Sequence, residues 1–350
     1  MDNILHISRT MDVGGAEKIV YQLATDLKED FQEVHVASTG GLWEPKLEEK
    51  GVKHHPLKDI EKKDFKTIVS NFRNLQKLIK TENITIIHTH HRMAAFYARI
   101  LTIFNKKVRH IYTAHGIFED KVSFYRFAVK NASVIAVGES VKNKLIEMGV
   151  VRQARVIVNA IQSDQTTDSD PEITKNMGLK IGFIGRLEKG KGLSYLLEAL
   201  AGLDNKDITL YIAGTGSLLD ELENESTALK LSDKVKFLGY RDDTDTIINS
   251  CDVMVLPSLF EGLPLTLIEY MSYGKPVIAS NIPGINDILN NENGTLFESG
   301  NSDSLRQAIS NFIDNPESYQ KKAMKSKEDY HAKFSYSIFL NGYRQVYRQE

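Results

Sequence analysis

The 350 residues are too many for one ordinary hydrophobic core and suit two domains. Apolar residues make up 41% and charged residues 26%, as in soluble globular proteins, and no apolar run approaches the roughly 18 residues of a membrane span. The formal net charge of −2 conceals an asymmetry: residues 1–161 carry 25 Lys and Arg against 18 Asp and Glu, and the remainder carries 19 against 28. A basic half and an acidic half in one chain indicate that the two halves have different functions.

The chain start and the cysteine content indicate a cytoplasmic location. The segment MDNILHISRT has no basic n-region and no small-residue cleavage site, so we interpret it as a first strand and not as a signal peptide. The single cysteine, Cys251, excludes an internal disulfide and fits a reducing compartment. Cys/His metal spacing is absent, so we expect no metal site.

Short apolar, β-branched runs alternate with helical patterns along the first half of the chain. The pattern predicts helices over 15–28 and 65–80, the second with apolar residues at three- and four-residue spacing. Continuous apolar runs of this length are typical of buried parallel strands. The strands are predicted at 3–8, 33–38, 84–89, 108–114, 132–138 and 155–160.

The alternation of strand and helix patterns stops at 162–176, a polar segment that we interpret as a linker between domains. Alternation then resumes, with strands predicted at 179–185, 208–214, 234–239, 252–257 and 275–280, and 301–350 is helical in character. The sequence therefore predicts an α/β protein with two Rossmann-like, doubly wound parallel-sheet domains and a cleft between them. We expect domains at 1–161 and 177–320 and helices at 321–350 that pack back toward the first domain.

The most informative segment is PSLFEGLPLTLIEYMSYGKPVIAS, which follows the predicted strand 252–257. Glu261 lies on its loop, Pro264 marks a helix start, and Glu269 lies inside the helix. On a continuous helix two carboxylates eight residues apart would be separated by about 12 Å, too far for most glycosidase pairs. The spacing suits two groups of hydroxyls on one ligand, such as a sugar and a ribose. A surface turn and an exposed helical Glu would be the default for either residue alone.

A second segment, GFIGRLEKGKGLSYLLEAL, nearly matches a phosphate-binding loop, with Gly185, Gly190 and Lys191 at the right spacing. Gly192 stands where that motif needs Ser or Thr to hold magnesium, which argues against a nucleoside triphosphatase. We predict instead that Arg186 and Lys191 together bind a diphosphate. The alternative is two solvated loop cations.

Two further strand ends carry candidate residues. Gly14 and Gly15 follow the first strand and would let the backbone approach a ligand at a helix start, although a plain tight turn explains them equally. The histidines in HTHH (88–91) offer no obvious third metal ligand, so we expect core or loop roles for them. His115, which ends a strand and precedes glycine, is the better candidate for a cleft residue. Asp168 and Asp170 form a D-x-D in the linker, which we interpret as a solvated loop.

Taken together, these segments resemble the family 4 retaining glycosyltransferases of the GT-B type, which build bacterial surface polysaccharides. The resemblance spans nearly the whole chain and rests on GGAE near the start, TAHG at 113–116, GRLEKGKG at 185–192, IAGTGS at 212–217 and FEGLPLTLIE at 260–269. The E-x7-E spacing is the most specific of these. Asn159 matches a strand-end asparagine of the family, although Ala160 replaces the usual glycine.

The resemblance implies a role for each matching residue. Arg186 and Lys191 would hold the donor diphosphate and stabilise the leaving group, Glu269 would bind the ribose, and Glu261 would bind the transferred sugar. His115 would contact that sugar from the opposite domain. Gly14 and Gly15 would line the phosphate and acceptor side, and Tyr240 and Arg241 would flank the base. Further contacts to the donor are implied for Gly185 and the backbone of Gly262, Leu263, Pro264 and Leu265.

The resemblance also implies the partners. The donor would be a nucleotide sugar, with uridine diphosphate the family's commonest carrier, and no further cofactor is required because the two cations replace a metal. We expect a glycan or lipid-linked acceptor, no nucleic acid, and a peripheral contact between the basic first half and the anionic inner face of the cell membrane. An epimerase or a phosphorylase on the same fold, and a catalytically silent nucleotide-binding partner, remain as alternatives.

Overall fold

The computed structural model describes residues 1–12, 14–162, 166–203 and 207–349, so positions 163–165 of the predicted linker lie outside the described residues. The described chain forms two compact units. Unit 1 consists of residues 1–160 together with the helical segment from Tyr336, and unit 2 of residues 161–335.

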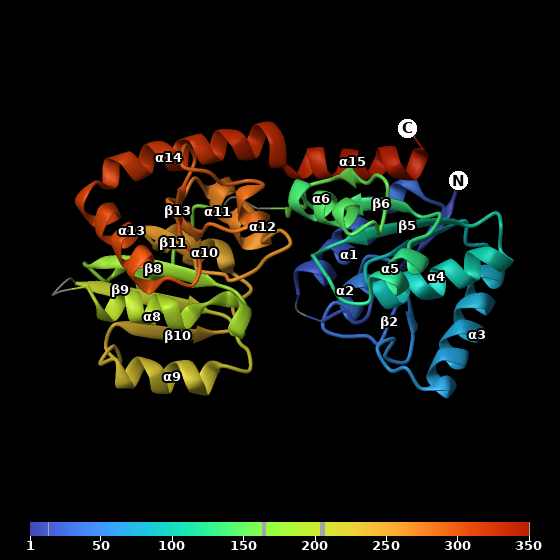
Figure 1. Ribbon diagram of the computed structural model, residues 1–350, viewed down its shortest axis with the longest axis horizontal. Coiled ribbons are helices and arrows are strands. Elements are labelled where there is room, and N and C mark those ends of the chain that lie inside the picture. Colours follow the sequence, from blue (N-terminus) through green and yellow to red (C-terminus); the bar gives the residue numbers. More distant parts are fainter. Residues whose placement is uncertain (13, 163–165, 204–206, 350) are drawn as a thin grey trace. The chain divides into compact units, whose positions relative to one another are not determined.

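Unit 1 is a seven-stranded parallel sheet in the order β3-β2-β1-β4-β5-β6-β7 with helices packed around it (Figure 1). The buried strands are continuous apolar runs, which is why the pattern predicted them. Its strands are β1 (Asn3–Ile7), β2 (Glu33–Ser38), β3 (Lys53–Pro56), β4 (Ile86–Thr89), β5 (Arg109–Ala114), β6 (Ser133–Ala136) and β7 (Arg155–Val156). Its helices are α1 (Gly15–Asp26), the short 3₁₀ turn η1 (Lys28–Asp30), α2 (Glu44–Glu49), α3 (Phe65–Thr81), α4 (Arg92–Phe104), α5 (Val122–Ala128), α6 (Glu139–Glu147) and α15 (Tyr336–Arg348).

The last helix, α15, is part of unit 1 and buries aromatic side chains there. Tyr343 and Tyr347 are almost fully buried, and Arg344 Nε lies 2.8 Å from Asp30 Oδ2. The Tyr347 hydroxyl is 2.8 Å from His88 Nδ1 on β4. Helix α15 thus supplies part of the polar interior of unit 1, and the predicted C-terminal helical segment is divided between the units at residue 336.

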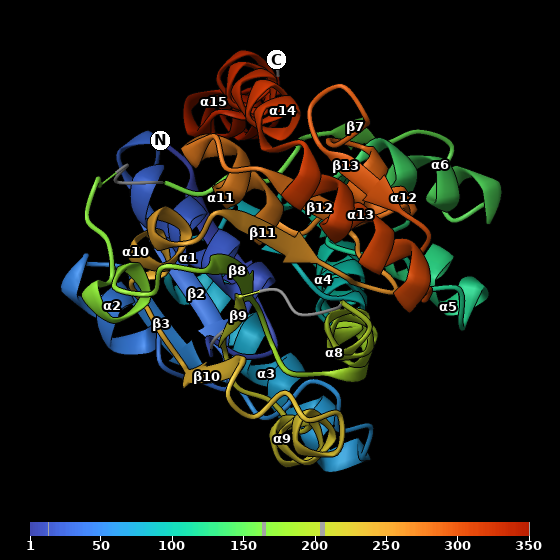
Figure 2. The ribbon, with the colours of Figure 1, turned by 90° about the vertical axis from the view of Figure 1, so that its left-hand side faces the viewer.

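Unit 2 is a six-stranded parallel sheet in the order β10-β9-β8-β11-β12-β13. Its strands are β8 (Leu179–Ile184), β9 (Ile208–Ala213), β10 (Val235–Gly239), β11 (Val253–Leu256), β12 (Val277–Ser280) and β13 (Thr295–Phe297). Its helices are α7 (Pro171–Thr174), η2 (Lys189–Lys191), α8 (Leu193–Ala201), α9 (Leu219–Ala228), α10 (Thr244–Ser250), α11 (Leu265–Tyr273), α12 (Pro283–Asn286), α13 (Ser302–Asp314), α14 (Pro316–Asp329) and the π-helical turn η3 (Tyr330–Phe334). Figure 2 shows α10 and α11 on one side of these strands and α8 on the other.

The strand order of each unit reverses at one place, β1/β4 in unit 1 and β8/β11 in unit 2. Consecutive connections leave such a point in opposite directions, so the loops beyond the carboxyl ends of the two strands diverge and leave room for a ligand. The predicted two doubly wound parallel-sheet domains are confirmed. Strands β3 and β13 were not predicted.

Candidate active site

The loops after β8 and β11 meet at the switch point of unit 2. Lys191 ends the turn η2, and its Nζ lies 2.6 Å from Oε1 of Glu261, which follows β11. The Ser258 hydroxyl donates to the same carboxylate oxygen at 2.7 Å. The amide of Leu259 donates to the Gly190 carbonyl at 2.8 Å, so backbone and side chains both join the loops. This arrangement holds a lysine and a glutamate in fixed positions at the expected ligand edge of the sheet.

Glycines make the close approach of these loops possible. Gly214 has φ +142°, and a Cβ there would lie 1.8 Å from the carbonyl oxygen of Gly185. Gly192 has φ +65°, and a Cβ there would lie 2.1 Å from the Pro257 carbonyl oxygen. Both positions therefore exclude any side chain, and the loops after β8, β9 and β11 pack backbone against backbone.

The other predicted donor contacts of unit 2 lie around this centre. Arg186 is 61% exposed and forms an ion pair with Glu188 at 3.0 Å. Glu269 is buried in α11, next to Tyr270, whose hydroxyl accepts from the Ile184 amide at the end of β8. Pro264 occupies the N-cap of α11, so Glu261 precedes the helix and the spacing of a continuous helix does not apply to the glutamate pair.

The remaining residues of that loop start α11. Gly262 is half-buried and Leu263 buried, and Leu265 is the first helical residue. Tyr240, just after β10, exposes 53% of its surface. Of the predicted set, the structure brings Lys191 and Glu261 into direct contact.

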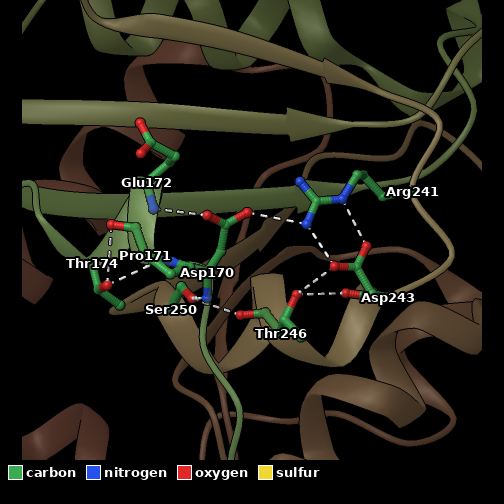
Figure 3. A network of polar contacts seen from close by, with 8 residues as sticks. All are labelled: Asp170, Pro171, Glu172, Thr174, Arg241, Asp243, Thr246 and Ser250. Carbon is green, nitrogen blue, oxygen red and sulfur yellow. Dashed lines mark hydrogen bonds and ion pairs between the residues drawn. The ribbon is translucent and has the colours of Figure 1, made fainter.

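Arg241 is held in a polar network (Figure 3). Its guanidinium contacts Asp243 at 2.6 Å and Asp170 at 3.0 Å, and Asp170 also caps α7 by accepting from the Glu172 amide. The hydrogen bond from Arg241 lowers the pKa of Asp243 to about 2. The interpretation of the D-x-D as a solvated loop was wrong for Asp170, whose side chain is 11% exposed. This network attaches the second part of the predicted linker to unit 2.

In unit 1 a row of buried histidines leads to His115, which follows β5. His6 Nδ1 lies 3.2 Å from His90 Nε2, and His90 Nδ1 lies 3.1 Å from His115 Nε2. Burial lowers the pKa of His6 to about 3 and that of His115 to about 4, and it lowers the pKa of His90 as well. All three rings are therefore neutral near pH 7.

The proton positions along this row follow from hydrogen-bond matching. In the described chain, His6 Nε2 is buried without a hydrogen-bond partner. Because a buried N–H left unpaired costs more than an unpaired lone pair, the His6 proton belongs on Nδ1. His6 then donates to His90 Nε2, and His90 donates through Nδ1 to His115 Nε2. A neutral His115 that accepts at Nε2 carries its proton on Nδ1. The row thus fixes the tautomer of His115.

The sequence did not single out His6, because its role depends on which strands are neighbours. His6 pairs in register with His88 on the neighbouring strand β4, and both precede the strand end by one residue. The nitrogens of His6, His88 and His90 lie within 4.8 Å of one another, as do ligand atoms of Glu33, His35 and Glu82. Both nitrogens of His88 already contact hydroxyls, those of Tyr347 and Thr113 at 2.8 Å. Hydrogen bonding accounts for the three-histidine group.

Gly14 and Gly15 begin α1, as expected for a helix start after β1. Gly14 is the N-cap with φ −175°, an extended conformation open to any residue. A Cβ at this position would meet only the Glu17 carboxylate, the mobile end of a side chain. The backbone itself therefore does not require glycine at position 14. Asn159, the other candidate of unit 1, is buried.

Comparison with known proteins assigns the chain to a family. Residues 164–329 match the family described as glycosyl transferases group 1, and residues 13–165 match glycosyltransferase family 4. The chain is 31% identical over 277 residues to the UDP-Gal:alpha-D-GlcNAc-diphosphoundecaprenol alpha-1,3-galactosyltransferase of Escherichia coli, covering 71% of this chain and 70% of that protein. The chain belongs to the GT-B glycosyltransferases.

Other relatives of this glycosyltransferase agree over greater length. A glycosyltransferase of Methanocaldococcus jannaschii, MJ1178, is 27% identical over 349 residues, covering 96% of this chain and 95% of that protein. The structure of Anabaena Alr3699/HepE in complex with UDP-glucose superposes with a TM-score of 0.86 at 21% identity, covering 99% of each chain. That likeness shows the shared fold. Within the described parts of the glycosyltransferase, none of the helices is both long and apolar enough to cross a bilayer.

Proposed function

We propose that this glycosyltransferase transfers a sugar from a uridine diphosphate donor, with retention of anomeric configuration, to a lipid-linked glycan acceptor for a cell-surface polysaccharide. The observation that carries the proposal is the Lys191–Glu261 pair at the β8/β11 switch point, where doubly wound sheets bind their ligands. The donor and acceptor classes are supported by the name of the Escherichia coli relative, and the donor class also by the UDP-glucose complex of Alr3699/HepE.

The residues have distinct roles in the proposed reaction. Lys191 and Arg186 bind the diphosphate and stabilise the negative charge that grows on it as the glycosidic bond breaks. Glu261, 2.6 Å from Lys191, accepts hydrogen bonds from sugar hydroxyls, and the buried Glu269 accepts from the ribose. The glycine-rich loops allow backbone amides to approach the phosphates. His115 donates to the sugar through Nδ1.

The departing phosphate can accept the proton of the acceptor hydroxyl, so the proposed mechanism needs no separate protein base. The two cations provide the charge that a metal would otherwise supply, and we propose that no further cofactor is required. We also propose that the enzyme works at the inner face of the cell membrane, where a lipid-linked acceptor would be found.

The test is a transfer assay with the purified full chain. A panel of UDP-, GDP- and ADP-sugars is first titrated by calorimetry, and each donor that binds is then incubated with N-acetylglucosamine linked through diphosphate to a short lipid. We expect one UDP-sugar to bind most tightly and to yield a disaccharide. Proton NMR of the new linkage should show the anomeric configuration of the donor. An inverted linkage would overturn the retaining mechanism, and tight binding of another nucleotide class alone would overturn the donor assignment.

A further inference from the structure

Unit 1 contains a basic pocket at the sheet edge opposite the histidine row. The pocket has a volume of about 870 Å³ and lies where β5, β6 and β7 begin, whereas His90 and His115 follow the ends of β4 and β5. Among the described residues, its lining includes four cationic side chains, those of Arg99, Lys106, Arg109 and Arg155, and no Asp or Glu. A volume of this size accommodates a small organic ligand.

Two of the four cationic side chains, Arg99 and Lys106, have no carboxylate partner in the part of the chain that the structure describes. Arg109 lies 3.7 Å from Asp2 and donates to the Tyr347 carbonyl, and Arg155 donates to Gln345. The Arg99 Nε atom is also buried and has no hydrogen-bond partner among the residues that the structure describes. Because a buried charged donor without a partner is costly, this group favours an anion in the pocket.

His110 gives the pocket a hydrogen-bond acceptor in addition to its cationic groups. His110 is buried and lines the pocket, and its Nε2 lies 2.8 Å from Thr89 Oγ1. Its Nδ1 has no partner within the described chain. The Thr89 hydroxyl is within 3.2 Å of the Ile111 carbonyl, so it donates there and accepts from His110 Nε2. The His110 Nδ1 atom therefore carries a lone pair, which the nearby Arg99 charge favours over an N–H.

We infer that this pocket is a second ligand site that binds a phosphate ester bearing hydroxyl groups. The phosphate is held by Arg99 and Lys106, with Arg109 and Arg155 contributing charge, and a ligand hydroxyl donates to His110 Nδ1. A free sugar or glycerol phosphate and the phosphoglycerol headgroup of a lipid share this chemistry. The pocket lies at the opposite sheet edge from His115 and shares no residue with the proposed donor site, so it is a separate site.

Two probes distinguish a free phosphate ester from a lipid headgroup as the ligand. Glycerol 3-phosphate is titrated into the ¹⁵N-histidine-labelled full chain, with glycerol and inorganic phosphate as comparisons, and vesicles of phosphatidylglycerol or phosphatidylcholine are tested by co-flotation. Three variants are compared with the wild type: Arg99→Met, Lys106→Met and, as a matched control, Lys107→Met, which removes a neighbouring exposed charge that does not line the pocket.

We expect glycerol 3-phosphate to bind with a shift of the His110 Nδ1 resonance and to bind at least tenfold more tightly than glycerol. Arg99→Met and Lys106→Met should each weaken binding about tenfold, with Lys107→Met unchanged and sugar transfer retained in all three. Binding of phosphatidylglycerol vesicles alone, lost in the same two variants, would support the site and assign it to a lipid headgroup. Binding of neither probe, or equal binding by Lys106→Met and Lys107→Met, would overturn the inference. Circular dichroism checks that each variant is folded.

Discussion

Lys191 Nζ lies 2.6 Å from Glu261 Oε1, although 70 residues separate them in the chain. The lysine side chain is 22% exposed and the glutamate 12%, so solvent screens this pair less than a surface salt bridge. Each partner holds the other at the switch point between β8 and β11. A charged ligand that binds here exchanges part of this contact for its own, with little cost in positioning the side chains.

Replacing Lys191 tests the proposed leaving-group role. Lys191→Met should lower the turnover number about 100- to 1000-fold, because removing one fixed donor to developing charge typically costs roughly 3–4 kcal/mol. The transfer rate is measured at saturating donor. Lys189→Met is the matched control, since it removes the same charge from the same turn at an exposed position. A Lys191→Met rate within threefold of this control would contradict the role.

The strand pattern predicted both sheets because buried parallel strands are continuous apolar runs. It missed β3, whose residues Lys53–Pro56 form an edge strand with the sequence KHHP, and β13, which has only three residues. Lys191 and Glu261 were predicted as site residues because each lies shortly after the end of a predicted strand. Their direct contact follows from the order of β8 and β11 in the sheet, which no local pattern contains.

The other misses also depend on contacts that are distant in the chain. Asp170 and Arg241 are 71 residues apart, and Asp170 stands in a polar segment typical of a loop. The role of His6 arises from its bond to His90, 84 residues away. Sequence periodicity reports which face of an element is buried, whereas these pairs depend on which distant segments the fold brings together.

Gly214 should tolerate no side chain. Gly214→Ala places a Cβ 1.8 Å from the Gly185 carbonyl oxygen at φ +142°, so we expect a loss of about 3–5 kcal/mol in the free energy of unfolding. Gly239→Ala is the control for backbone strain alone, with φ +68° and nothing within 4 Å of the added atom, and should cost about 1–2 kcal/mol. Urea unfolding measures both. Equal losses of unfolding free energy in the two variants would show that the contact with Gly185 adds nothing to the cost of backbone strain.

Stability should fall as the pH drops below about 6.5. Burial lowers the pKa of His6 and His110 to about 3 and that of His115 to about 4. In the unfolded chain these side chains take up protons near pH 6.5, so below that pH the unfolded state binds more protons and gains stability. Each group contributes up to about 1.4 kcal/mol per pH unit until its folded pKa is reached.

The measurement is the urea midpoint from pH 8 to pH 4. The urea midpoint of the wild type should be constant above pH 7 and fall steadily below about pH 6.5. His110→Gln should reduce the slope of this fall. The matched control is His331→Gln, at an exposed position. A wild-type midpoint that stays constant down to pH 4 would contradict neutral, buried histidines in unit 1.

The histidine row should control the proton position on His115. In the wild type, ¹⁵N NMR of the side chains should show His115 with its proton on Nδ1, because Nε2 accepts from His90 at 3.1 Å. His90→Gln keeps an amide donor for that bond and should preserve the tautomer. His90→Phe removes the donor, so His115 should move toward the Nε2–H form that free imidazole side chains prefer. Transfer should then fall in His90→Phe and largely recover in His90→Gln, because only the Nδ1–H form donates to the sugar. If both variants kept the Nδ1–H signal, the row would be a packing feature without influence on His115.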